Sequence, residues 1–146
     1  MHAYKPLLLV LPLLLLAACA TNRLDHAGNR HGRWRTYHGS GNTQLQATGR
    51  YRHNQFVGRW RYYTPTGELE RYERFRPHGL SLLTYYYPDG HVWKKGRVLL
   101  VDTERSHRYS WTGDWQIFNP DGSLQQVETY VQGQLTATRP AAPPRR

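Results

Sequence analysis

Residues 58–67 read Gly-Arg-Trp-Arg-Tyr-Tyr-Thr-Pro-Thr-Gly and decide the fold of the chain. Alternate side chains of a β-strand share one face, so Gly58, Trp60 and Tyr62 point away from the arginines between them. The following Thr-Pro-Thr-Gly has turn chemistry, because proline presets φ and glycine accepts the left-handed conformation. The stretch therefore predicts a strand, a tight turn and a returning strand.

The same spacing of glycine, tryptophan, aromatic residue and glycine recurs along the chain. The residues that define the copies are Gly32, Trp34, Tyr37 and Gly41; Gly58, Trp60, Tyr63 and Gly67; Tyr86 and Gly90; and Gly113, Trp115, Phe118 and Gly122. In the third copy Ser81 and Leu83 replace the first glycine and the tryptophan, so this copy is degenerate. Repetition of one short pattern along the chain is typical of stacked supersecondary units.

The pattern predicts an all-β fold of about four successive β-hairpins, with almost no helix in the mature chain. No stretch shows a period of 3.6 residues. One hairpin cannot bury its apolar face, whereas hairpins laid edge to edge bury a continuous strip. We therefore expect Trp34, Trp60, Leu83 and Trp115 to form one row of the core.

These units resemble the bacterial variant of the MORN repeat (membrane occupation and recognition nexus), whose members are often filed as antitoxins. The resemblance covers roughly residues 32–135. It implies an elongated, twisted antiparallel sheet of hairpins that is used for binding rather than catalysis. It is weakest in the third copy.

The N-terminus has the pattern of a lipoprotein signal peptide, predicted over residues 1–18. Lys5 precedes the apolar run Leu7 to Leu16, which is too short to span a bilayer as a mature helix. Leu16-Ala17-Ala18-Cys19 resembles the bacterial lipobox, so Cys19 is the predicted lipid attachment site, with palmitate among its acyl chains. By the same resemblance, Ala20 favours delivery to the outer membrane, facing the periplasm. The alternative is an ordinary cleavage site with an incidental cysteine.

The remaining chain divides into three predicted parts. Residues 19–31 are the lipidated cysteine and a tether, residues 32–137 the repeat domain, and residues 138–146 a disordered tail rich in proline and arginine. Within the domain, Val98 to Val101 predicts an extra strand and Asp102 to Ser110 a projecting polar loop.

The charge balance suggests what the domain binds. The chain has 20 Lys and Arg against 10 Asp and Glu, a formal net charge of +10. A secreted chain does not meet nucleic acid, so the excess favours an acidic protein partner, anionic lipid or lipopolysaccharide. The alternative is a solvated face that keeps an aromatic sheet soluble.

One face of the first two repeats is the candidate partner-binding face. It consists of Arg33, Arg35, Tyr37, Arg59, Arg61 and Tyr63. Arginine and tyrosine are favoured at protein-binding hot spots, although cation–π stacking that only covers the sheet would use the same residues. The function predicted is a tethered binding protein whose partner is a protein, with neutralisation of a toxin as one version. An envelope structural protein that binds anionic lipid or lipopolysaccharide is the alternative.

Catalytic, cofactor and metal sites are not expected. The chain has eight histidines, but none has a ligand spacing such as His-Glu-x-x-His. No nucleophile elbow, phosphate loop or cofactor fingerprint appears. The single cysteine excludes an internal disulfide. We therefore expect a protein that is not an enzyme.

Overall fold

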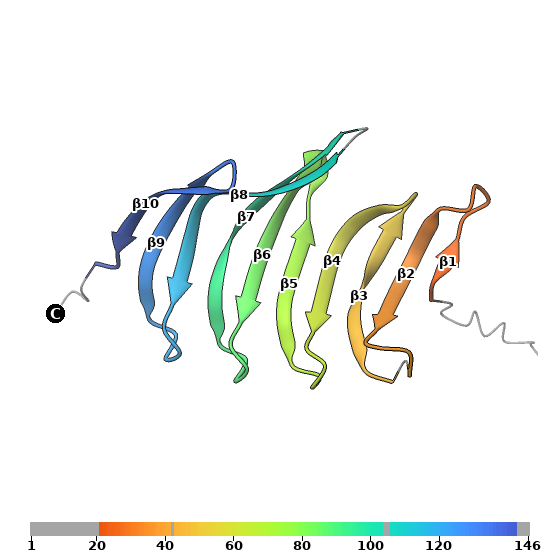
Figure 1. Cartoon of the computed structure of the whole chain (residues 1–146), viewed down its shortest axis with the longest axis horizontal. Coiled ribbons are helices and arrows are strands. Elements are labelled where there is room, and N and C mark those ends of the chain that lie inside the picture. The colour runs from red at the N-terminus through yellow and green to blue at the C-terminus, as the bar shows by residue number, and fades with distance from the viewer. Residues whose placement is uncertain (1–20, 42, 104–105, 143–146) are drawn as a thin grey trace, which may run out of the picture.

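The described residues form one open antiparallel sheet of ten strands, each hydrogen-bonded to its neighbour in the sequence. The computed structural model describes residues 21–41, 43–103 and 106–142. The strands are β1 (Arg23–Leu24), β2 (Arg30–Tyr37), β3 (Leu45–Arg52), β4 (Gln55–Tyr63), β5 (Leu69–Phe75), β6 (Leu80–Tyr86), β7 (Val92–Thr103), β8 (Ser106–Phe118), β9 (Leu124–Val131) and β10 (Gln134–Pro140). They lie side by side from β1 at one end to β10 at the other (Figure 1). The all-β prediction is confirmed.

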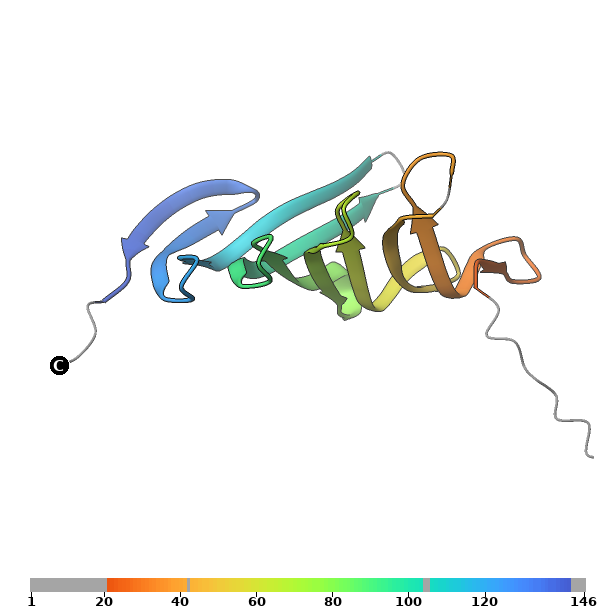
Figure 2. The ribbon, with the colours of Figure 1, turned by 90° about the horizontal axis from the view of Figure 1, so that it is seen from below.

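Helix is nearly absent from the described residues. A 3₁₀ turn, η1 (Pro77–Gly79), joins β5 to β6. Within the same residues, no helix has the length and apolar character needed to cross a bilayer. The strands curve, and in the described part of the chain no second layer covers the sheet (Figure 2). Burial must therefore come from side chains on one face covering one another.

Three hairpin turns have the hydrogen bonds that the Pro-x-Gly pattern predicts. In the second repeat, the Thr64 N–H donates to the Glu68 carbonyl at 2.9 Å, and the Gly67 N–H donates to the Thr64 carbonyl at 3.0 Å. Gly67 has a φ of 95°, the left-handed region that favours glycine. The same pair of bonds closes the turns that contain Gly90 and Gly122.

The aromatic residue before each turn pairs directly with an aliphatic residue after it. The pairs are Tyr37 with Leu45, Tyr63 with Leu69, Tyr86 with Val92, and Phe118 with Leu124. The register shifts by one residue at each pair, so all four hairpins, including the degenerate third, start alike. In the first turn Gly39, not the expected Gly41, has a positive φ.

The first glycine of each regular repeat lies within a strand and not in a turn. Gly32, Gly58 and Gly113 have φ values of 79°, 67° and 67° within their strands. At Gly58 and Gly113 the register against the preceding strand shifts, which identifies β-bulges. Ser81 occupies this position in the third repeat, and it pairs with Phe75 without any shift. Replacing glycine by serine there coincides with the loss of the bulge.

A row of side chains from successive strands forms the core. Trp60, Leu83 and Trp115 are 2%, 1% and 0% exposed, whereas Trp34, near the first edge, is half-buried. Pairing links Trp60 to Glu73, Glu73 to Leu83, and Leu83 to Gly96. The expected row exists as a line of neighbouring positions, with Trp34 only partly inside it. Its buried side chains form two hydrophobic clusters, one that contains Trp60 and one that contains Leu83 and Trp115.

Two glycines outside the repeat pattern make this row possible. A Cβ atom on Gly49 would lie 2.1 Å from the Trp60 ring, and one on Gly96 would lie 2.3 Å from the Trp115 ring. Each indole therefore lies flat on the backbone of the preceding strand. Its Nε1 donates to the next carbonyl along that strand, Arg50 at 3.0 Å and Arg97 at 3.2 Å.

Three sequence-based boundaries need correction. The proposed tether (19–31) contains β1 and the start of β2, because Arg23 pairs with His31 and Leu24 with Arg30. The proposed tail (138–146) contains the end of β10, in which Pro140 pairs with Gln126. The expected loop over residues 102–110 is the end of a long β7–β8 hairpin, with pairing as far as Thr103 and Ser106. The predicted signal peptide and Cys19 lie outside the described residues.

Candidate partner-binding face

Exposed cations from six strands share the face opposite the tryptophans. We call it the basic face and define it by Arg33, Arg35, Arg50, Arg59, Arg61, Arg74, Lys95, Arg97 and Arg139, all of which are exposed. Those of β2 to β7 alternate with residues of the opposite face, as Arg59 and Arg61 do with Trp60, and Arg139 of β10 joins them by pairing with Val127. Asp114 and, by the same alternation, Glu70 add carboxylates to this face.

Two pairs of arginines lie directly opposite one another across neighbouring strands. Arg33 of β2 pairs with Arg50 of β3, and Arg59 of β4 pairs with Arg74 of β5. Directly opposed residues have Cβ atoms about 4.5–5.5 Å apart, where like charges destabilise a sheet. A face whose only purpose was solubility would be better served by mixed signs. The pairing therefore concentrates positive charge at two positions of this face.

A second row on the basic face contains aromatic side chains. Arg35 pairs with Thr48, Thr48 with Arg61, and Arg61 with Tyr72. Tyr86 lies in the same neighbourhood, where burial and the nearby Tyr72 raise the pKa of its hydroxyl while Arg61 acts in the opposite direction. The row thus combines guanidinium groups with partly desolvated tyrosines.

The sequence-predicted site residues fall into two groups. Arg33, Arg35, Arg59 and Arg61 are exposed on the basic face, as the strand alternation requires. Tyr37 and Tyr63 are half-buried at the ends of β2 and β4, next to the turns. The His38 ring nitrogen Nε2 lies 2.8 Å from the Tyr63 carbonyl, which connects these two turns.

The basic face continues beyond the two repeats that the sequence singled out. A hollow of about 410 Å³ opens between β6 and β10, and its lining includes Lys95, Arg97, Asp114 and Arg139. Arg139 Nη2 contacts Asp114 Oδ2 at 2.7 Å. The Asp114 pKa is lowered first by the hydrogen bond from Thr129 and then by the charge of Arg139. Arg139 belongs to a segment assigned to the tail, so the sequence analysis missed it.

The opposite face, which we call the aromatic face, carries charges that serve packing. Glu73 is 2% exposed, and its Oε1 accepts hydrogen bonds from Ser81 Oγ at 2.5 Å and Tyr109 Oη at 3.1 Å. Burial raises the pKa of this carboxyl, while the two hydrogen bonds and Arg71 oppose the change. The Arg71 guanidinium lies 3.9 Å from the centre of the Tyr62 ring. These groups are enclosed by the sheet's own side chains.

Lys94 is a further cation that packs against rings of the aromatic face. Its Nζ lies 4.1 Å, 4.4 Å and 4.8 Å from the ring centres of Trp93, Trp111 and Tyr85. Burial lowers the pKa of the ammonium group, and the charge of Glu128 opposes this. Cation–π contacts of this kind attach the lysine to the core and leave it unavailable to a partner.

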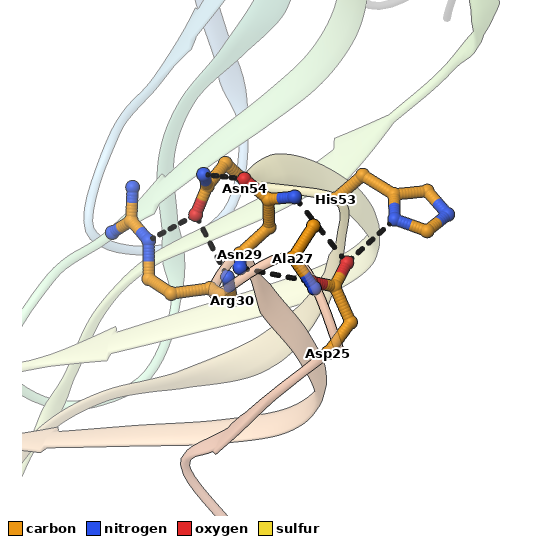
Figure 3. A network of polar contacts seen from close by, with 6 residues as sticks. All are labelled: Asp25, Ala27, Asn29, Arg30, His53 and Asn54. Atoms are coloured by element: carbon orange, nitrogen blue, oxygen red, sulfur yellow. Dashed lines mark hydrogen bonds and ion pairs between the residues drawn. The ribbon is translucent and has the colours of Figure 1, made fainter.

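A third polar cluster joins two turns at the β1 end of the sheet (Figure 3). Asp25 accepts hydrogen bonds from the backbone N–H groups of Ala27 at 3.0 Å and Asn29 at 2.9 Å. His53 Nδ1 lies 2.7 Å from Asp25 Oδ2. The Asn29 N–H bond and then the His53 bond lower the Asp25 pKa to about 2. The carboxylate is therefore held in its charged form.

Comparison with known proteins supports the repeat interpretation. The family described as MORN repeat variant matches residues 111–132, which run from Trp111 in β8 through the Gly122 turn and β9 to Gln132. The comparisons found no similar curated protein and no similar solved structure. The fold and the match describe an all-β protein that is MORN-repeat-like, and a MORN repeat suggests a repeat-containing binding domain.

Proposed function

We propose that the basic face binds an acidic protein partner and that the chain is a lipoprotein of the outer membrane facing the periplasm. The observation that carries the binding proposal is the pairing of Arg33 with Arg50 and of Arg59 with Arg74. Each pair raises the free energy of the unliganded sheet, and a bound carboxylate relieves that repulsion. Neutralising a toxin in the periplasm is a specific version of this function.

A protein partner suits the face better than a lipid surface for a chemical reason. Arg61 lies beside Tyr72 and near Tyr86, and arginine with tyrosine is the composition that dominates binding energy at protein interfaces. The hollow beside Lys95 and Arg97 adds a concave feature that one acidic side chain of a partner can enter. A membrane of anionic lipid requires only the summed charge.

The test compares two variants of equal net charge. Arg59→Gln with Arg61→Gln removes two cations from the basic face, whereas Arg145→Gln with Arg146→Gln removes two cations at the C-terminal end of the sequence. The detergent-solubilised full chain is used to capture proteins from envelope extract at about 150 mM salt, where exposed charge contacts are already screened. We expect a stoichiometric partner that the first variant loses and the second retains.

Two outcomes would contradict the proposal. Equal loss of the partner in both variants would show that net charge alone governs capture. Failure to capture any protein, together with salt-sensitive binding to vesicles of anionic lipid or lipopolysaccharide, would establish an envelope structural protein instead. If a partner is captured, toxicity of that partner when it is expressed alone in the periplasm tests the immunity role.

A further inference from the structure

The polar cluster at the β1 end contains a set of metal-ligating groups. Asp25 lies between β1 and β2, His31 lies in β2, and His53 lies in the turn between β3 and β4. One potential ligand atom from each residue lies within 4.8 Å of the other two. The His31 and His53 rings have centroids 5.2 Å apart at an interplanar angle of 55°. The β1–β2 hairpin brings Asp25 close to His31, and His53 joins them because β2 also pairs with β3.

The donor types match one class of metal. Two imidazole nitrogens with one carboxylate oxygen is a ligand set that zinc uses, with a fourth position left open. Zinc bonds of about 2.0–2.2 Å in tetrahedral geometry place ligand atoms roughly 3.3 Å from one another. The present separations, 2.7 Å between His53 Nδ1 and Asp25 Oδ2 and at most 4.8 Å overall, lie on both sides of that value. Small rotations of the exposed imidazoles close the set.

Hydrogen bonds around the cluster hold the carboxylate and the two turns in place. Asp25 Oδ1 is occupied by the backbone N–H groups of Ala27 and Asn29, which leaves Oδ2 directed at His53. Asn54 Nδ2 donates to Asn29 Oδ1 at 2.7 Å and so joins the two turns (Figure 3). Supporting bonds of this kind orient ligands in metal sites.

His53 occupies the first position of the two-residue turn between β3 and β4. His53 and Asn54 have φ values of 48° and 64°, and they connect Arg52 to its pairing partner Gln55. A two-residue turn with both φ values positive prefers asparagine, aspartate or glycine at its first position. Histidine also accepts a positive φ, and the turn places its Nδ1 2.7 Å from Asp25 Oδ2.

The charges of the nearest arginines do not prevent a cation from binding at this cluster. The Arg30 Nη1 donates to Tyr51 Oη at 2.9 Å, and its guanidinium lies 4.2 Å from the centre of the Tyr51 ring. Arg23, the pairing partner of His31, is exposed, so solvent screens its charge. We propose that Asp25, His31 and His53 bind one zinc ion and thereby fasten β1 and the β3–β4 turn together.

The test is calorimetric titration of the purified full chain, without a histidine tag, with zinc chloride in a buffer that does not chelate metal. We expect one equivalent of zinc to bind, and His31→Ala and His53→Ala each to weaken it at least tenfold. Two matched controls are His26→Ala, in the same turn, and His91→Ala, whose Nδ1 lies 3.2 Å from Asp89 Oδ2. Neither control should change the affinity. Zinc should also raise the Tm of the native protein but not that of His31→Ala.

The His31→Ala variant distinguishes a metal site from a hydrogen bond that only links the two turns. A link needs only Asp25 and His53, so it predicts that His31→Ala leaves every zinc measurement as it was. His31 is exposed, so its replacement tests the site without disturbing the core. The absence of one-equivalent binding would overturn the proposal. So would equal weakening by His26→Ala, which would mean binding to scattered surface histidines.

Discussion

Replacing Gly49 by alanine should destabilise the sheet by displacing Trp60. Gly49 lies in β3 without a positive φ, so its backbone accepts alanine. The new Cβ would lie 2.1 Å from Cδ2 of an indole that is 2% exposed. Since carbon atoms pack at about 3.5–4.0 Å, the ring must move by roughly 1.5 Å. The strain therefore arises from the clash between the new Cβ and the Trp60 ring, and not from the backbone conformation.

The size of the effect lies between two limits. Overpacking of a core costs about 1–3 kcal/mol. Complete expulsion of the ring would forfeit about 150–250 Å² of burial, worth about 4–6 kcal/mol at 25 cal/mol per Å². Loss of the Trp60 Nε1 hydrogen bond to Arg50 would add about 1 kcal/mol. Reduced entropy of the unfolded chain returns about 0.4–1 kcal/mol. We therefore expect the free energy of unfolding to fall by about 2–4 kcal/mol.

The assay is urea unfolding followed by circular dichroism, with Gly41→Ala as the matched control. Gly41 also lacks a positive φ, and a Cβ there would meet nothing within 4 Å, so its replacement should be neutral or slightly stabilising. The reasoning predicts that Trp60→Leu, although destabilising alone, reduces the cost of adding Gly49→Ala. Additive costs would refute it. Equal stability of Gly49→Ala and the native chain would refute it as well.

Three further predictions concern single residues. Burial places the folded pKa of Glu73 above its unfolded value of 4.5, so the stability associated with this carboxyl is complete below 4.5 and is lost as pH rises through the folded pKa. Glu73→Gln should therefore stabilise more at pH 8 than at pH 4 in urea unfolding, whereas Glu70→Gln, on an exposed carboxyl, should show no such difference. The pH dependence due to Asp25 has the opposite sign, because folding lowers its pKa from 3.8 to about 2. The stability that this carboxylate contributes is present above pH 3.8 and is lost as pH falls through 2. In acid unfolding between these pH values, Asp25→Asn should therefore lose less stability than the native chain. Gly58→Ala should cost about 1–2 kcal/mol in urea unfolding, because Gly58 has a φ of 67° although no atom would contact the new Cβ; an unchanged midpoint would show that the bulge tolerates a side chain.

Local features of the fold were predictable from the sequence because they depend on neighbouring residues. A proline followed two positions later by glycine sets a turn, and the hydrogen bonds around Gly67 follow from that chemistry. Alternation within one strand placed Trp60 in the core and Arg59 and Arg61 on the other face. Each of these inferences needs fewer than ten residues of context.

Features that depend on the register between strands were not predictable in this way. Gly49 supports Trp60 from another strand, and the repeat pattern gives no reason to single out this glycine. Arg50 and Arg74 became part of the basic face only when pairing placed them opposite Arg33 and Arg59. Pairing between strands also joined Asp25 to His53, 28 positions away, which no ligand spacing in the sequence would suggest.

The single-layer sheet separates stability from binding. Each strand contributes alternate residues to two faces, and the aromatic face supplies the burial that holds the hairpins together. The cations of the basic face are exposed, so removing one costs little stability. Removing one member of an opposed pair, such as Arg74 beside Arg59, should even relieve repulsion. If the arginines of the basic face are arranged for binding, a variant that lacks Arg74 should therefore be more stable than the native chain and should bind the partner more weakly.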